Sequence, residues 1–284
     1  MTKRILSILP ILLSVVLLSS CGNFNKLLKS DDVDKKYAAA LNYYEEEEWD
    51  KAGALLEDLM PLLKGRSEYE RANFLYANTK YHQGFYLESS FHFTSFGQTF
   101  PRSQYAEEAA YLNARSLVNE SPSHNLDQQS TIQAMSALQE FMRRYPESKF
   151  MPEANTVYDE LSRKIEVKAF ENAKLNYQLI NYDPNYYKAT IVAMDNFRKN
   201  YPSSEFIEES MYLKIDAQYN YAKESIESKQ RERHLEVIAY YQAFIDAYPK
   251  SKFLRPAERL YSSSLLELER LKKSTAPATT AVNN

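Results

Sequence analysis

Apolar residues recur at intervals of three and four positions along most of this chain, which is the spacing of an amphipathic helix. The stretch ALNYYEEEEWDKAGALLEDL, residues 40–59, places alanine, aromatic residues and leucine at positions 40, 43, 49, 52 and 56. Residues 76–93 continue the same alternation of small and aromatic side chains. Glycine, which tight hairpins require, is absent after Gly97. The pattern predicts an all-α protein and disfavours nucleotide-binding and all-β folds.

A second pattern interrupts the helices at four places and reads F-x-x-x-[FY]-P-x-S-x-[FY]. In the last copy, Phe244 and Tyr248 share one helical face, and Pro249 cannot continue a helix because it has no amide hydrogen. Ser251 stands where an N-cap would begin the next helix, and Phe253 would fold back on the turn. The motif therefore predicts a helix end, a corner and a helix start. Its copies are FGQTFPRSQY (96–105), FMRRYPESKF (141–150), FRKNYPSSEF (197–206) and FIDAYPKSKF (244–253).

The spacing of these corners indicates a repeat of helix pairs. Their prolines lie 45, 56 and 47 residues apart, longer than a plain tetratricopeptide unit of about 34 residues but within the range of helical-pair arrays. We predict a tetratricopeptide-repeat solenoid of about five helix pairs over residues 35–273, closed by a C-terminal capping helix at residues 251–273. The expected units are 35–67, 68–102, 103–147, 148–203 and 204–250. Polar inserts at 119–130, 180–187 and 222–233 lengthen the last three units, and such inserts often map to a binding face.

The first twenty residues have the composition of a targeting segment. Lys3 and Arg4 precede a short apolar run that is broken by polar residues, and Leu18-Ser19-Ser20-Cys21-Gly22 resembles the lipobox of bacterial lipoproteins. We expect residues 1–20 to be a signal peptide, Cys21 to carry lipid and anchor the chain to a membrane, and residues 21–34 to form a lipidated linker. The alternative is a chance cysteine after an ordinary cleavage site. Residues 274–284, STAPATTAVNN, are predicted to be a disordered tail.

Charge and histidine spacing argue against nucleic acid and catalysis. Without residues 1–20 the chain has 35 − 2 = 33 basic and 38 acidic residues, so a basic nucleic-acid-binding face is not expected. The four histidines are scattered and form no metal-ligand spacing, and we interpret them as solvated or helix-face residues. No nucleophile elbow, P-loop or dinucleotide fingerprint is present. We predict a non-enzymatic protein that requires no cofactor and no metal. The histidines are His82, His92, His124 and His234.

Aromatic residues supply the candidates for binding. The run Glu45–Glu48 before Trp49 could contact a basic partner, but four consecutive acids on a helix mostly face water, which is the simpler interpretation. Trp49 fits the large-residue packing position of the first unit. The phenylalanines that open each corner motif are expected to be core. Tyrosines beyond the needs of the core are candidates for a protein interface, where tyrosine is enriched; they are Tyr186, Tyr187, Tyr219 and Tyr221.

The lipobox, five tetratricopeptide-like units and the Tyr-Pro-x-Ser-x-Phe corners together resemble the BamD family of outer-membrane protein assembly factors. The resemblance covers roughly residues 21–271, and RRYPESKFMPEA and KNYPSSEFIEES carry it best. It implies a scaffold that binds unfolded outer-membrane β-barrel proteins through its N-terminal units and a BamA-like β-barrel insertase through units four and five. The implied contacts on the concave face of units one and two are Tyr44, Trp49, Tyr81 and Phe85.

Two other functions remain open from the sequence. SusD-like surface lipoproteins also combine a lipobox with helical repeats and bind glycans, although they are much longer. A periplasmic repeat adaptor for cell-envelope machinery is the second alternative. The acidic run Ser30-Asp31-Asp32 lies nine residues after Cys21 rather than directly behind it, which favours an outer-membrane location facing the periplasm over export to the cell surface.

Overall fold

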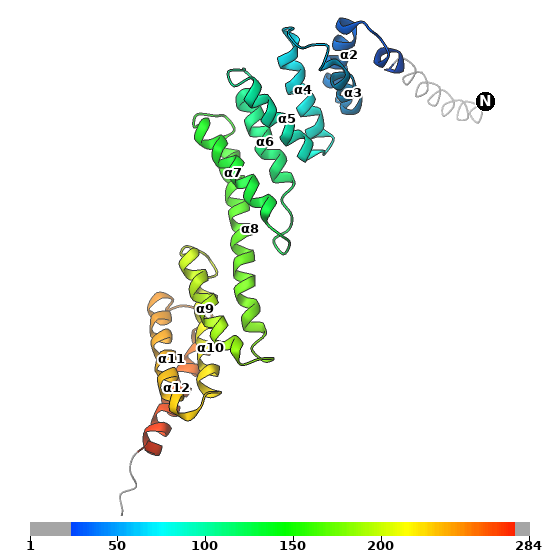
Figure 1. The fold of residues 1–284 in the computed structure, drawn as a ribbon. Coiled ribbons are helices and arrows are strands. Elements are labelled where there is room, and N and C mark those ends of the chain that lie inside the picture. The colour runs from blue at the N-terminus through cyan, green and yellow to red at the C-terminus, as the bar shows by residue number, and fades with distance from the viewer. Residues whose placement is uncertain (1–23, 276–284) are drawn as a thin grey trace, which may run out of the picture. The chain divides into compact units, whose positions relative to one another are not determined.

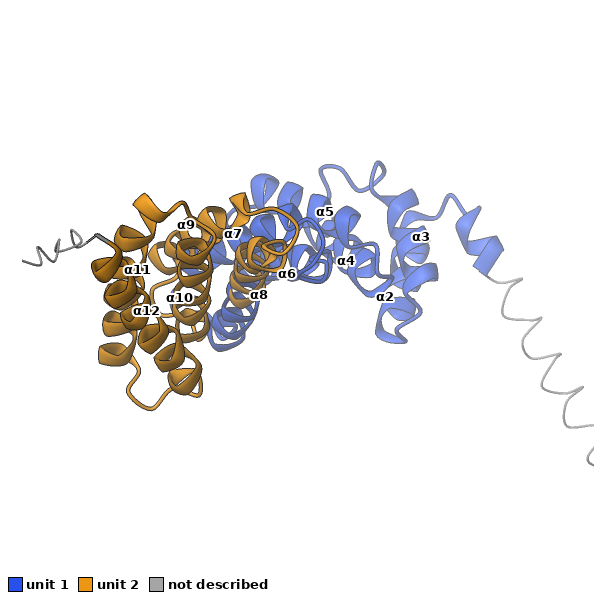
Figure 2. Cartoon of the chain, turned by 90° about the horizontal axis from the view of Figure 1, so that it is seen from below, with its two compact units in different colours: residues 1–162 blue, residues 163–284 orange. Residues whose placement is uncertain are grey.

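The computed structural model describes residues 24–275, and every regular element in that part of the chain is a helix (Figure 1). The chain divides into two compact units, residues 1–162 and 163–284 (Figure 2). The predicted all-α class is confirmed. The predicted signal peptide, Cys21 and residues 276–284 lie outside the described residues.

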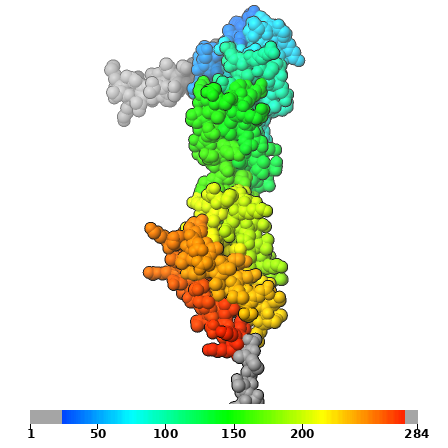
Figure 3. Space-filling model, turned by 90° about the vertical axis from the view of Figure 1, so that its left-hand side faces the viewer, coloured from blue at the N-terminus to red at the C-terminus, as the bar shows by residue number. Residues whose placement is uncertain are grey.

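Unit 1 is built from consecutive antiparallel helix pairs. Each helix packs on the next one along the chain, and the first helices of successive pairs, α4 and α6, also touch. In the space-filling view the colours of this unit follow one another from blue to green (Figure 3). The helices are α2 (Val33–Glu45), α3 (Trp49–Leu59), α4 (Glu68–His82), α5 (Tyr86–Thr99), α6 (Ala106–Asn119) and α7 (Gln129–Arg144).

Unit 2 repeats this arrangement: α10 packs on α9, on α11 and on α12. Its helices are α9 (Asn185–Asn200), α10 (Ile207–Lys223), α11 (Glu227–Ala247) and α12 (Leu254–Thr275). The long helix α8 (Met151–Gln178) begins in unit 1 and ends in unit 2. Within the described residues the predicted array of five helix pairs and a closing helix is therefore confirmed.

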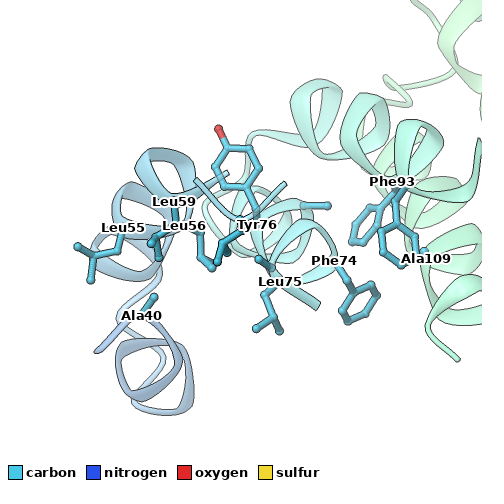
Figure 4. Packing of buried hydrophobic residues seen from close by; sticks show 13 residues of the cluster. Ala40, Leu55, Leu56, Leu59, Phe74, Leu75, Tyr76, Phe93 and Ala109 are labelled. Carbon is cyan, nitrogen blue, oxygen red and sulfur yellow. The ribbon is translucent and has the colours of Figure 1, made fainter. Parts of the chain in front are cut away.

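The cores include several residues that the helical spacing predicted, such as Leu56, Tyr76 and Phe93. In unit 1, Leu55, Leu56 and Leu59 of α3 pack with Leu75 and Tyr76 of α4, as Figure 4 shows. Unit 2 has a separate cluster built around Phe170, Met194, Ile215, Val237 and Phe244. The four phenylalanines that open the corner motifs are all buried, as predicted; they are Phe96, Phe141, Phe197 and Phe244.

Each corner serine forms the same two hydrogen bonds. Its hydroxyl donates to a glutamate on the first helix of the preceding pair, and it accepts the backbone N–H two residues ahead. Ser148 donates to Glu107 at 2.6 Å and accepts from the N–H of Phe150 at 3.1 Å. The other pairs are Ser103–Glu70, Ser204–Glu166 and Ser251–Glu208.

The serine is therefore not the N-cap that the sequence predicted. A backbone turn closes first, with the N–H of Met151 bonded to the carbonyl of Ser148, and the helix starts three residues after the serine. The hydroxyl accepts a backbone N–H within this turn. It does not accept one of the unpaired N–H groups in the first turn of the helix, as an N-cap would.

The aromatic residue that ends each corner stacks on a ring four residues after the glutamate. Phe150 lies 4.3 Å from Tyr111 with an interplanar angle of 8°, and Phe206 lies 4.6 Å from Phe170 at 6°. The other two stacks are Tyr105 on Phe74 and Phe253 on Tyr212. The glutamate and the ring share one helical face because they are four residues apart, so a pattern E-x-x-x-[FY] accompanies every corner.

Residues 24–33, which the sequence suggested as part of a linker, pack against the first helix pair. The ring of Phe24 meets Tyr43 edge-on at 5.9 Å. Lys36, only 3% exposed, donates to the carbonyl of Leu28 at 3.0 Å and pairs with Asp58 at 2.5 Å.

None of the helices between residues 24 and 275 combines the length and the apolar composition needed to cross a bilayer.

Candidate functional site

Three of the four aromatic residues predicted to contact substrate meet in unit 1, and His82 joins them. Trp49 stacks on His82 with ring centroids 4.1 Å apart and planes 8° apart. Tyr44 meets Trp49 edge-on at 5.2 Å, and Tyr81 meets His82 edge-on at 5.6 Å. We call these four residues the Trp49 cluster. Tyr44 and His82 lie near the ends of α2 and α4, and Trp49 begins α3, so the cluster lies at the turns between paired helices.

Phe85, the fourth predicted contact, lies beside the cluster at the turn between α4 and α5. The residue is 51% exposed. The ammonium group of Lys80 lies 5.4 Å from the ring centroid and pairs with Glu88 at 3.1 Å. Phe85 therefore offers an accessible aromatic surface next to the buried part of the cluster.

A hollow of about 540 Å³ opens between these turns. Trp49, His82 and Phe85 supply its aromatic walls, and its remaining lining is Glu46, Glu47, Glu48, Asp50 and Gln83. No lysine or arginine is among these eight residues. The hollow therefore combines aromatic surface with an excess of negative charge.

Gln83 fixes one wall of the hollow by joining α4 to α3. Its side-chain amide donates to the Asp50 carboxylate at 2.9 Å and to the carbonyl of Trp49 at 3.2 Å. The Oε1 atom of the same side chain is buried without a hydrogen-bond partner. These bonds hold Trp49 in place.

The protonation states preserve the negative charge of the hollow. Burial lowers the pKa of His82 below 6.5, and the nearby Glu47 carboxylate opposes that shift, so the imidazole is neutral at neutral pH. Burial, with a contribution from Glu108, raises the pKa of Tyr44 to about 12. Neither ring therefore brings a compensating charge.

Glu47 occupies an unusual backbone conformation. Its φ of 58° lies in the left-handed region, and no other non-glycine residue of the described chain has positive φ. The turn from α2 to α3 is thereby closed by a residue with a carboxylate, where glycine would be free of steric cost.

In unit 2 the structure brings together only two of the four tyrosines predicted for a partner interface. Tyr187 and Tyr221 lie 6.3 Å apart, and the guanidinium group of Arg233 covers Tyr221 at 3.6 Å. Tyr219 points elsewhere, because residues two apart on a helix diverge by about 200°. It packs with the core of unit 2 and meets the buried His234 edge-on at 5.8 Å. Tyr186 makes no ring contact with the other three tyrosines.

Across residues 24–275 no three side chains of histidine, cysteine, aspartate or glutamate are grouped so that they could hold a metal ion. His234 is 1% exposed and its Nδ1 lies 3.1 Å from the Ser264 hydroxyl oxygen, so its role is in packing.

The sequence did not identify His82 or Gln83 as parts of a site. Their position at the end of a helix, directly after Tyr81, was a usable signal, because the ends of paired helices meet at neighbouring turns.

Comparison with known proteins supports the resemblance inferred from the corners. Residues 29–168, just under half of the chain, match the family model YfiO, described as an outer membrane lipoprotein. The matched region contains α2 to α7 and the first part of α8. No protein in the curated set matches the chain.

Proposed function

We propose that this chain is a lipid-anchored scaffold of β-barrel assembly, facing the periplasm, because residues 29–168 match the YfiO family model of outer membrane lipoproteins. The family match is the single observation that carries the proposal. The helix pairs support it, because stacked pairs present extended surfaces suited to binding polypeptides.

In this proposal the two aromatic sites have different tasks. Tyr44, Trp49, Tyr81 and Phe85 contact unfolded β-barrel substrates, whose strands carry alternating apolar residues and aromatic girdles. The interface with a BamA-like insertase includes Tyr187 and Tyr221, which are half-buried at the surface of unit 2. A scaffold that holds both partners raises the local concentration of substrate at the insertase.

The anchor is the first part to test. The wild-type protein and a Cys21→Ala variant, each tagged at the C-terminus, are purified from membranes in mild detergent. We expect the wild type to sediment with outer membranes and to recover an insertase, and Cys21→Ala to lose membrane attachment. Equal attachment of both proteins would refute the lipid anchor.

Photo-crosslinking tests the division of tasks. A photoreactive residue at Phe85 is expected to capture unfolded barrel proteins, and one at Tyr221 to capture the insertase. Phe91, which is 66% exposed on α5, is the matched control for a surface aromatic. If no insertase is captured from any of these positions, the assembly role is wrong.

A further inference from the structure

The hollow beside Trp49 has the composition of a site for a cationic side chain. Cations are attracted to aromatic faces, with tryptophan the strongest, and carboxylates accept charge-assisted hydrogen bonds. Four carboxylate residues and three aromatic rings line the hollow, and the lining contains no lysine or arginine. The hollow thus provides both halves of a cation site.

Unit 2 shows how the chain itself fills such an arrangement. There, Arg233 lies 3.6 Å from the ring centroid of Tyr221, and Lys214 lies 3.7 Å from that of Tyr240 while pairing with Asp195 at 2.7 Å. In unit 1, Lys51 pairs with Glu48 and lies over Tyr43, and Lys80 pairs with Glu88. Lys80 also lies over the ring of Phe85, so two of the eight lining residues, Glu48 and Phe85, already contact a cation of the chain.

We propose that the hollow beside Trp49 binds the guanidinium group of an arginine in an extended polypeptide segment. Arginine fits better than lysine because its planar group stacks on aromatic rings, donates two parallel hydrogen bonds to a carboxylate, and is more weakly hydrated. In this assignment the guanidinium group stacks on the ring of Trp49, and Glu47 accepts its hydrogen bonds. The negative charge of the lining carboxylates favours the positively charged arginine over a neutral side chain. The inference deepens the proposed function and rests on it only for the source of the arginine.

The test uses Trp49 as its own reporter, since it is the only tryptophan of the chain. The full chain in detergent is titrated with the peptide acetyl-Gly-Arg-Gly-amide, and with a matched peptide in which citrulline replaces arginine. Citrulline keeps the shape of arginine without the charge. We expect a saturable change in Trp49 fluorescence with the arginine peptide only, and a weaker response at high salt. Equal responses to both peptides would overturn the proposal.

Glutamate variants test whether the arginine peptide binds in the hollow. Glu47→Gln is expected to weaken arginine binding about threefold to fivefold, as for the loss of one charged partner at a partly exposed site. Glu160→Gln removes an exposed carboxylate of α8 in the same unit and is expected to bind like the wild type. Wild-type affinity in Glu47→Gln would contradict the assignment. If that variant does not fold, Glu46→Gln, which changes the same wall, is measured instead and is held to the same outcome.

Two further measurements separate the alternatives. Mg²⁺ at the same charge concentration is expected to leave the fluorescence unchanged, and an equal response would show unselective counter-ion binding and overturn the proposal. The titration contains no insertase. A chain that binds the arginine peptide but captures no insertase therefore refutes the assembly role alone, and the reverse result refutes the arginine site alone.

Discussion

The aromatic residues near Trp49 and those near Tyr221 differ in what covers them. At Tyr221 the chain supplies its own cation, Arg233, at 3.6 Å. At Trp49 a neutral imidazole covers one ring face at 4.1 Å, and the adjoining hollow is lined by carboxylates. Tyr221 thus contacts a cation of the chain itself, whereas Trp49 contacts an uncharged ring beside a group of carboxylates. The difference shows that exposure of an aromatic residue is a weaker sign of binding than the charges around it.

The largest expected effect comes from removing the ring that organises the unit 1 site. Trp49→Ala loses the contacts with His82 and Tyr44 and should lower the free energy of unfolding of unit 1 by about 2–3 kcal/mol, less than a fully buried tryptophan because Trp49 is half-buried. Urea unfolding followed by circular dichroism measures this. A loss below about 0.5 kcal/mol, the size of an ordinary surface substitution, would mean that the ring is not packed.

Substituting the corner serines tests whether the serine–glutamate bond contributes the same stability in both units. Ser148→Ala in unit 1 and Ser204→Ala in unit 2 each remove a hydroxyl that donates to a glutamate at 2.6 Å. Each should cost about 1.5 kcal/mol, because a hydrogen bond to a charged group is lost. Denaturant midpoints of the two variants measure the cost. Clearly unequal losses would show that the units differ in their framework as well as in their sites.

Arg233→Gln breaks the internal cation contact of unit 2. We expect a loss of about 1 kcal/mol, the range of a cation–aromatic contact near the surface, confined to unit 2. Arg231→Gln, which changes an exposed arginine on the same helix, is the matched control. Hydrogen exchange resolves the two units. If both variants have the same stability, the contact over Tyr221 contributes nothing.

Glu47→Gly separates backbone strain from charge. Glycine accepts a φ of 58° without the steric cost of a side chain, so the variant should gain about 0.5–1 kcal/mol in stability. It should bind the arginine peptide as weakly as Glu47→Gln does. Thermal unfolding and the fluorescence titration give the two numbers, and a destabilised variant would mean that the carboxylate itself stabilises the turn.

Lowering the pH is expected to have the smallest of these effects. Protonated imidazole quenches tryptophan fluorescence, so the Trp49 signal should fall as the pH drops through the pKa of His82, which burial places below 6.5. His82→Gln should remove this step. The pKa of the buried His234 in unit 2 is also lowered by burial. Below pH 6.5 the unfolded chain therefore takes up protons that the folded protein does not, and the free energy of unfolding should decrease as the pH falls in both units. A step at or above pH 6.5 would contradict the direction assigned to His82.

The helix pairs and corners were predictable because their signals are local. Helical spacing, the proline and the following aromatic all lie within ten residues of one another. The glutamate partner of each serine was not predictable, because it lies 33 to 43 residues earlier on another helix. The divergence of Tyr219 and Tyr221 follows from helical geometry and was available from the sequence. By contrast, the stacking of Trp49 on His82 depends on how two turns meet, which no local pattern specifies.

The serine–glutamate bonds also have a consequence for how such a chain can change length. The bond persists although the serine lies 33, 41, 38 or 43 residues after its glutamate. The serine–glutamate bond at each corner therefore forms regardless of how many residues separate the two helices that it joins. Exposed loop positions such as residues 123–127 are therefore suitable places to insert a tag or a reporter domain.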